Sequence, residues 1–308
     1  MAGQNSKGMK NSFKLVFKRI LRMTGLLLIV LFVSCKTVPQ IPDAFLQEIK
    51  VLPLDEGASV YIIADVKHGR SIIDLLPLAE LKDKQTARMI EKTDFLIAAM
   101  FPQESGRRFQ AVTWGNYPSF RAKMAFGFNR NWKKQKSKEG AFWYSKANNL
   151  SLSLSSKQAF VVSSVSSVPV NPAPSAPGVE IPKELGDFNR GAPISCWLED
   201  PAPMFDQMLS RLPIRFPVQG LFLCLYSKGN NQYEAEIRLQ FGNASQALGA
   251  AAILALASGL VDNSASSFFS VFLINQPVTN GRNLDIKTNL MNEKEISLLF
   301  EMFLLYLE

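Results

Sequence analysis

Few residues in this sequence have the types and spacing that catalysis requires. The chain contains one histidine, His68, so a Ser-His-Asp triad would have to use it. No glycine-rich phosphate-binding loop of the Walker or Rossmann type occurs in the sequence. Carboxylates such as Asp65 and Asp74 stand where caps and solvent-facing positions are expected, without a second acidic cluster that could hold a metal. We therefore expect no catalytic residue, metal or cofactor, and we predict that the protein is not an enzyme.

The three cysteines occur in two different settings. Cys35 directly follows a short apolar run near the N-terminus, whereas Cys196 and Cys224 lie in apolar segments that we expect to be strands. An oxidising compartment would allow Cys196 and Cys224 to form a disulfide. The alternative is two buried free thiols, because free cysteine packs as a small hydrophobic residue. A bridge would require the two Cα atoms to lie about 4.4–6.8 Å apart.

The first 34 residues have the charge and hydropathy pattern of a secretory signal. Six basic residues and no acidic residue lie in this leader, whose uncharged apolar end at 23–34 is followed by Cys35. This apolar run is shorter than the roughly 20 residues that a membrane-spanning helix needs. We therefore predict that the leader is removed by cleavage after Ser34. An uncleaved N-terminal anchor is the alternative.

Residues 32–35, Phe-Val-Ser-Cys, resemble a bacterial lipobox. In lipoproteins with this motif the cysteine thiol receives a diacylglyceryl group, the signal peptide is cut just before it, and the new amine is usually acylated. The resemblance implies that Cys35 carries the lipid, with acyl chains such as palmitate. Phe32 stands where leucine is usual, a departure that is typical of spirochaete lipoproteins. Two or three acyl chains would anchor the protein stably, at about 0.8 kcal/mol per buried methylene.

Removal of the leader also changes the charge balance. The whole chain has 34 basic and 26 acidic residues, and without the six basic residues of the leader the balance is 28 against 26. We expect no nucleic-acid partner, because such a site would need clustered lysine and arginine on the folded domain. A local exception is 130–138, which includes Arg130, Lys133, Lys134 and Lys136. This segment is either a solvated loop or a contact for anionic head groups, each basic residue contributing about 1 kcal/mol.

The second half of the chain repeats segments of the first half in the same order, with an offset of about 130 residues. The matching segments are 57–62 and 191–196, 75–78 and 211–214, 95–100 and 221–226, 113–116 and 240–243, and 149–152 and 283–286. Between the halves, a segment rich in serine and proline is typical of a linker. The predicted organisation is a leader at 1–34, the acylated cysteine and a tether at 35–56, a first repeat at 57–162, the linker at 163–186 and a second repeat at 187–308.

Each repeat is predicted to contain a strand, a helix, two strands, a helix and two strands. Segment 233–241 alternates apolar and polar residues, which predicts a strand with one buried face. Strands joined by short turns form antiparallel sheet, and we expect the helices on one face of it, in an α+β architecture. The expected strands are 59–64, 95–101, 140–144, 150–154, 194–198, 220–226, 233–241, 267–274 and 283–288, with helices at 117–128 and 244–261 and a turn at 228–231.

This order of elements resembles uncharacterised bacterial envelope proteins and a treponemal family of outer-membrane lipoproteins. Members of that family face the periplasm and insert amphipathic helices into the inner leaflet. The resemblance covers most of the chain after the leader, but only as a pattern, so no functional residue is transferred. It implies a lipid-anchored protein of the cell envelope, at the periplasmic face of an outer membrane.

Two apolar segments could supply membrane-contacting helices. Segment 244–261 contains no charged residue, and 296–307 is apolar at all but two positions. Helices that are apolar nearly all round are either buried in a core or in contact with lipid. Asn292 and Glu295 fit a capping box that would start the second helix. The lipid contacts that we predict on the two helices are Leu248, Ile253, Leu254, Leu256, Leu260, Leu299, Phe303 and Leu304.

These features predict a non-catalytic envelope lipoprotein whose partner is membrane lipid. It would bind lipid or insert helices into the periplasmic leaflet of the outer membrane. The alternative is a scaffold that binds protein partners and packs both apolar helices into its core.

Overall fold

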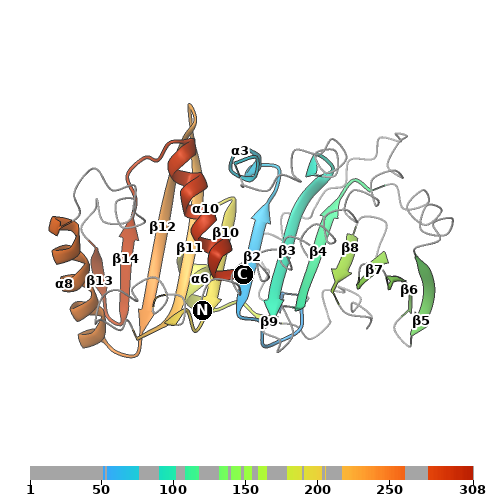
Figure 1. The fold of residues 1–308 in the computed structure, drawn as a ribbon, viewed down its shortest axis with the longest axis horizontal. Helices are drawn as coiled ribbons and strands as arrows, with labels where there is room; N and C mark the ends of the chain where they lie inside the picture. The colour runs from blue at the N-terminus through green and yellow to red at the C-terminus, as the bar shows by residue number, and fades with distance from the viewer. Residues whose placement is uncertain are drawn as a thin grey trace, which may run out of the picture. The chain divides into compact units, whose positions relative to one another are not determined.

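The computed structural model describes residues 51–52, 54–75, 90–101, 108–117, 132–137, 140–146, 149–154, 159–164, 179–188, 191–202, 205, 217–260 and 277–307. The chain forms two compact units, and the helices and strands of both are labelled in Figure 1. Unit 1 comprises Met1–Glu56, Leu78–Glu180 and Glu308, and unit 2 comprises Gly57–Pro77 and Ile181–Leu307. The leader, the predicted cleavage site at Ser34 and the predicted lipidation site at Cys35 lie outside the described residues.

Unit 2 contains an antiparallel sheet with the strand order β13-β14-β12-β11-β10-β2. These strands are β2 (Val60–Asp65), β10 (Ile194–Glu199), β11 (Val218–Gly229), β12 (Gln232–Phe241), β13 (Val278–Asn280) and β14 (Asn283–Lys287). The helices of this unit are α3 (Arg70–Ile73), α6 (Lys183–Phe188), α8 (Ala244–Leu260) and α10 (Glu293–Leu307). The predicted strands and the predicted helix at 244–261 therefore occur close to their expected bounds in this unit, apart from 267–274, which lies outside the described residues.

The long hairpin of β11 and β12 is closed by a two-residue turn at Asn230 and Asn231. Their φ angles are 51° and 55°, so both residues adopt the left-handed conformation. A type I′ turn requires positive φ at both central positions, and asparagine tolerates that conformation better than most residues. The predicted turn at 228–231 is confirmed.

One face of this sheet is the apolar core of unit 2. The odd-numbered residues of β12 from Tyr233 to Phe241 are all at most 3% exposed. Tyr233 lies on this face, its hydroxyl donating to the backbone oxygen of Ser71 on α3 and its backbone pairing with Met291, just before α10. Since α3 and α10 also contact the sheet, they cover this face.

The opposite face of the same sheet carries a helix as well. Successive residues of a strand point to opposite faces, so Arg238 points away from the core described above. Its guanidinium carbon lies 4.7 Å from the centroid of the Phe188 ring on α6. The prediction that helices cover only one face is therefore wrong for unit 2, because α6 packs on the other face.

The strands of unit 1 pair antiparallel in the order β3-β4-β8-β7-β6-β5. The strands are β3 (Thr93–Phe101), β4 (Arg108–Gly115), β5 (Lys133–Ser137), β6 (Gly140–Ser145), β7 (Leu150–Leu154) and β8 (Ala159–Ser163), and a separate pair is formed by β1 (Val51–Leu52) and β9 (Val179–Glu180). The strands predicted at 95–101, 140–144 and 150–154 are confirmed. The helix predicted at 117–128 lies outside the described residues except for Tyr117.

An aromatic cluster holds the β5 end of this sheet together. The cluster consists of Tyr117, Trp132, Trp143, Leu150, Leu152 and Phe160. The rings of Tyr117 and Phe160 meet edge to face with centroids 4.5 Å apart. The Tyr117 hydroxyl is 2.6 Å from the hydroxyl of Thr93, and burial raises its pKa to about 12. Trp132 directly precedes β5, and Trp143 on β6 lies opposite Lys134 on β5. The cluster therefore fixes the position of β5.

The two units have different bounds from the two predicted repeats. β2 lies in the predicted first repeat, yet it pairs with β10 of the second, Ile194 standing opposite Ala64. The predicted linker at 163–186 is described only near its ends, where it includes β9 and the first part of α6. The α+β class with antiparallel sheets is observed, while the internal duplication stays a prediction.

Candidate functional site

Helix α8 begins at a reciprocal pair of side-chain hydrogen bonds. The side-chain oxygen of Asn243 accepts from the backbone N–H of Gln246 at 3.0 Å, and the side-chain oxygen of Gln246 accepts from the backbone N–H of Gly242 at 3.0 Å. Such bonds satisfy N–H groups that have no partner inside the first turn. The start of the helix predicted at 244–261 is confirmed.

One side of α8 packs on the sheet of unit 2 through small residues. Ala247 and Ala250 are 0% and 5% exposed, and Leu254 is 9% exposed. Spacings of three and four residues place these side chains on one helical face. The helix contacts β12, β13 and β14, and Figure 1 shows it beside the β13 end of the sheet. The alanines allow the helix backbone to approach the strands closely.

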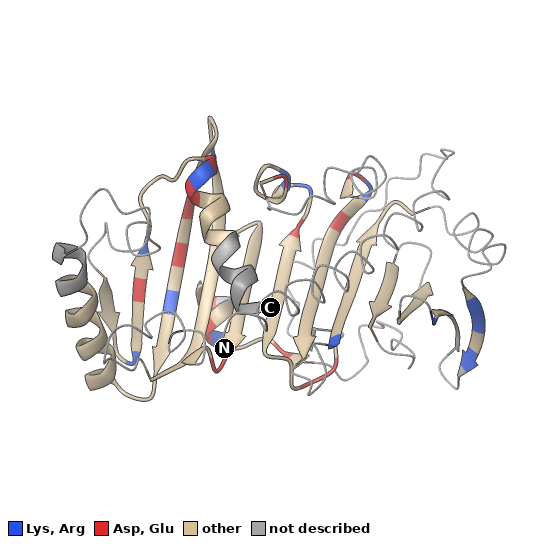
Figure 2. Ribbon diagram, in the orientation of Figure 1, with Lys and Arg blue, Asp and Glu red and all other residues tan. Residues whose placement is uncertain are grey.

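The other side of α8 is apolar although it faces solvent. Leu248 is 58% exposed, and Gly249, Ala252 and Ala255 are exposed as well. No acidic or basic residue occurs anywhere in α8, as Figure 2 shows for its described part. A solvent-facing helix usually carries charged residues on its outer face. The outer face of α8, defined as Leu248, Gly249, Ala252 and Ala255, is therefore the feature of this unit that best fits contact with lipid.

Helix α10 differs from α8 because its first half belongs to the core. The backbone N–H groups of Lys294 and Glu295 donate to the Asn292 side chain at 2.9 and 3.2 Å, and the Glu295 carboxylate accepts from the backbone of Asn292 at 2.7 Å. The predicted capping box is therefore confirmed. Ile296 and Leu299 are 0% and 1% exposed.

The predicted lipid contacts consequently fall into three groups. Leu248 is exposed and Ile253 is partly exposed, as lipid contact requires. Leu254 and Leu299 are buried, so for these two residues the structure favours core packing, because each lies on the helical face that packs against the sheet. The side chains of Leu256, Leu260, Phe303 and Leu304 lie outside the described part of their helices.

The predicted head-group contacts lie on a strand. Lys133, Lys134 and Lys136 are exposed, as both alternatives require, but they lie on strand β5 and not in a loop. β5 pairs with β6, with Lys134 opposite Trp143. Arg130 lies outside the described residues.

Cys196 and Cys224 are two buried free thiols. In the antiparallel register of β10 and β11, Cys224 stands opposite Ser195, and Cys196 stands opposite Leu223. Because neighbouring residues of a strand alternate between faces, the two thiols point to opposite sides of the sheet. The disulfide is therefore not formed. Burial raises the pKa of both thiols to about 12.

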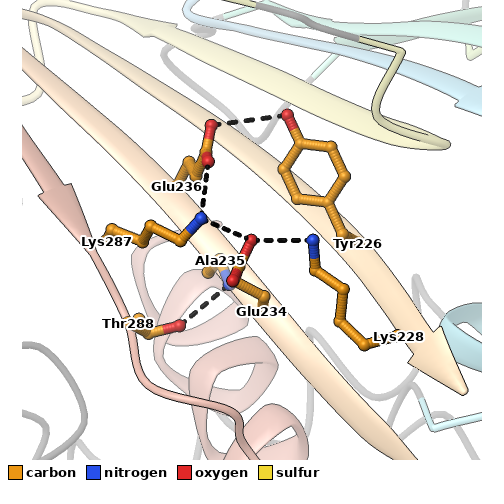
Figure 3. A network of polar contacts seen from close by, with 7 residues as sticks. All are labelled: Tyr226, Lys228, Glu234, Ala235, Glu236, Lys287 and Thr288. Atoms are coloured by element: carbon orange, nitrogen blue, oxygen red, sulfur yellow. Dashed lines mark hydrogen bonds and ion pairs between the residues drawn. The ribbon is translucent and has the colours of Figure 1, made fainter.

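A network of ion pairs crosses β11, β12 and β14 (Figure 3). The Glu234 carboxylate lies 3.0 Å from both Lys228 and Lys287, and Lys287 also lies 3.3 Å from Glu236. Although partial burial acts to raise the pKa of Glu234, the hydrogen bonds and charges of the two lysines lower it below its ordinary value. The two lysines and two glutamates of the network balance in charge, so the network offers little net charge to a ligand. Its role is to join the three strands.

The other chemically capable side chains of the described regions are dispersed. The Nδ1 atom of His68 lies 2.6 Å from the Asp65 carboxylate, at an exposed position. No group of three or more histidine, cysteine, aspartate or glutamate residues in the described parts of the chain could hold a metal ion. None of the described helices is long and apolar enough to cross a membrane.

Comparison with known proteins first shows a similarity to a class, the outer-membrane-associated lipoproteins. The model of the family described as "Outer membrane-associated lipoprotein TP0453" matches residues 48–175, which is less than half of the chain. The match supports the predicted resemblance to treponemal lipoproteins. It also supports the predicted location, a lipid-anchored protein associated with the outer membrane.

Three similar solved structures are crystal forms of one protein, TP0453. Form III has a TM-score of 0.56 and 15% sequence identity, over 81% of this chain and 96% of that chain. Form I has a TM-score of 0.54 at 14% identity over the same shares, and form IV has a TM-score of 0.53 at 15% identity, over 85% of this chain and 99% of that chain. These similarities show a shared fold. No curated protein sequence matches the chain.

Proposed function

We propose that this chain is a non-catalytic envelope lipoprotein that inserts the outer face of α8 into the periplasmic leaflet of the outer membrane. The single observation that supports this proposal is an uncharged 17-residue helix with Leu248 58% exposed. The acyl anchor predicted at Cys35 would hold the protein at the same leaflet.

The insertion is expected to be shallow and weak by itself. Complete burial of one leucine contributes about 1.5–3 kcal/mol, and the exposed alanines contribute less. An apolar helical face that lies in the interface plane reaches only about 5–10 Å into the head-group and acyl boundary. The anchor would make this second contact intramolecular, which raises the effective concentration of the helix at the membrane. Modest apolar area on α8 is therefore sufficient for the proposed role.

The proposal is tested by liposome flotation of the chain that lacks residues 1–34 and carries Cys35→Ala, so that no acyl chain contributes. Because insertion is weak without the anchor, we expect a small but measurable fraction of this protein to float at high concentrations of phosphatidylcholine vesicles. The double variant Leu248→Glu/Ala252→Glu should float at least about tenfold less, because two charges would have to enter the apolar layer.

Leu290 provides a matched control, since it is 52% exposed but lies in the connection before α10. Leu290→Glu should leave flotation unchanged. If the unsubstituted protein does not float and yields no lipid on extraction, lipid binding is refuted while the anchor remains possible.

The second candidate is a scaffold that binds a protein partner through the same surface. Exposed apolar patches also occur at protein–protein interfaces, so Leu248 would suit this role too. If the protein is a scaffold, the non-acylated protein should not bind vesicles. Leu248→Glu should then disrupt cross-linking to a partner in intact cells.

A further inference from the structure

The charge of the chain after the leader is strongly segregated along the sequence. Residues 105–179 contain 11 basic residues and one acidic residue, Glu139, a net charge of +10. The rest of the chain after residue 34 contains 17 basic and 25 acidic residues, a net charge of −8. The near-neutral total therefore conceals a basic segment, which lies within unit 1.

The described basic residues of this segment are mostly open to solvent. Lys133, Lys134 and Lys136 on β5 and Lys146 after β6 are all exposed, and none of them forms an ion pair with another described residue. Figure 2 shows the basic residues along β5. Arg108 is an exception in unit 1, because it pairs with Asp55 at 3.2 Å.

The basic residues on β11, β12 and β14, and Arg282 in the turn before β14, are in a different situation. Lys228 and Lys287 both contact Glu234, Arg238 forms two hydrogen bonds of 2.7 Å with Asp285, and Arg282 pairs with Glu184 at 2.9 Å. Their charges are neutralised inside the unit. The lysines of β5 therefore offer positive charge to an external partner, whereas these residues do not.

We propose that Lys133, Lys134 and Lys136 dock unit 1 on the anionic phospholipid head groups of the leaflet that holds the acyl anchor. The inference rests on the membrane location in the proposed function but does not require insertion of α8. A phospholipid surface is favoured over other anions because unit 1 is the unit that the anchor reaches first. β1 begins at Val51, 16 residues after Cys35, a span of at most about 55 Å for a fully extended chain.

The structure also keeps the lysines in place for this contact, with Lys134 and Lys136 on one side of the edge strand β5 and Lys133 on the other. β5 is the last described strand of its sheet, and the buried Trp132 and Trp143 fix it against the aromatic cluster. The ordinary role of lysine on an edge strand is to prevent pairing with another sheet. That role explains β5 alone, but it does not explain the charge excess across residues 105–179 or the exposed Lys146 outside this strand.

The experiment compares two triple variants of the Cys35→Ala chain that lacks residues 1–34. The first is Lys133→Gln/Lys134→Gln/Lys136→Gln. The control is Lys67→Gln/Lys183→Gln/Lys294→Gln, which removes the same charge from three exposed lysines of unit 2. Partition is measured on phosphatidylcholine vesicles and on vesicles with an equal share of phosphatidylglycerol, and thermal unfolding checks that both variants fold.

A lysine near an anionic membrane contributes about fivefold to partition, so the β5 variant should bind the mixed vesicles on the order of 100-fold less tightly. The control variant should bind like the unsubstituted chain, and phosphatidylcholine binding should be unchanged in both. Raising the salt from about 0.1 M to about 1 M shortens the Debye length from about 10 Å to about 3 Å and should remove the difference.

Three results would overturn the proposal. Equal losses in both triple variants would show that only net charge matters. Aggregation of the β5 variant with undiminished binding would mean that the lysines only protect a sheet edge. Self-association of the unsubstituted chain without vesicles, lost in the β5 variant, would identify a second copy as the partner. Failure of α8 insertion can be distinguished from failure of lysine docking. Without α8 insertion the chain would not bind phosphatidylcholine vesicles, whereas without lysine docking it would lose only the preference for phosphatidylglycerol.

Discussion

At the residue scale, the informative positions are those where polarity disagrees with exposure. Leu248 is apolar and 58% exposed, which is the basis of the proposed membrane contact. Glu234 is the opposite case, a carboxylate that is 8% exposed and depends on Lys228 and Lys287 for its charge. A buried charge that loses its partners destabilises the fold. Glu234 is therefore tested by measuring stability, and Leu248 by measuring membrane binding.

Glu234→Gln is expected to destabilise unit 2 by about 1–3 kcal/mol near neutral pH, because charge-assisted hydrogen bonds to two lysines are lost. The pKa of Glu234 is lowered in the folded state, so its stabilising effect is fully present above the ordinary value of 4.5 and is lost as the pH falls through the lowered pKa. Urea unfolding at a series of pH values measures the difference from the unsubstituted protein.

Glu199 is a suitable control for that series, since it is exposed at the end of β10. Glu199→Gln should show little loss at neutral pH. A loss for Glu234→Gln that stayed constant from neutral to strongly acidic pH would contradict the assignment.

Gly249→Ala is expected to stabilise α8 by about 0.5–1 kcal/mol, because glycine in a helix has more conformational freedom to lose than alanine. A Cβ atom at Gly249 would meet nothing within 4 Å. By contrast, a Cβ at Gly115 would collide with the backbone oxygen of Lys92, so Gly115→Ala should destabilise unit 1. Thermal unfolding of both variants checks the prediction, and a lower stability of Gly249→Ala would contradict it.

At the element scale, features with local sequence signals could be predicted and features with distant partners could not. The alternating strand β12, the asparagine turn after β11 and the capping box of α10 each depend on a few neighbouring residues, and all three are observed. The pairing of β2 with β10 joins segments about 130 residues apart, and no local pattern specifies it. The sequence of β5 lacks the alternation of apolar and polar residues that predicts a strand, because both of its faces are exposed at a sheet edge.

The candidate site shows the same limit. The absence of charge in α8 could be read directly from the sequence, but the side that faces solvent could not. Its residues are uncharged and apolar on most sides, so helical periodicity carries little directional signal. Only the packing of Ala247 and Ala250 on the sheet determines that Leu248 points outward.

Asn292→Ala is expected to destabilise α10 and unit 2 by about 1 kcal/mol, because two backbone N–H groups lose the side-chain oxygen that caps them. Asn292→Asp keeps an acceptor oxygen and should retain most of the stability. Urea unfolding of both variants measures the effect. Equal losses in the two variants would show that the cap itself is not the cause.

At the scale of the whole molecule, an acyl anchor, a basic unit and an apolar helix face would act together at the membrane. The anchor at Cys35 would supply most of the membrane affinity, the lysines of β5 would recognise the charge of the leaflet, and the outer face of α8 would enter it. The similarity to TP0453 structures, with TM-scores of 0.53–0.56, supports the fold in which these features are placed. The proposed contact of α8 with lipid is the central claim.

The most direct test of that claim attaches a polarity-sensitive fluorophore to α8. In the chain that lacks residues 1–34 and carries Cys35→Ala, the remaining thiols at Cys196 and Cys224 are buried with pKa values near 12, so Leu248→Cys provides the reactive site for labelling. A label introduced through Leu290→Cys serves as the reference. We predict that vesicles shift the emission of the Leu248 label to shorter wavelength and leave the Leu290 label unchanged. An unshifted Leu248 label on vesicle-bound protein would contradict the account.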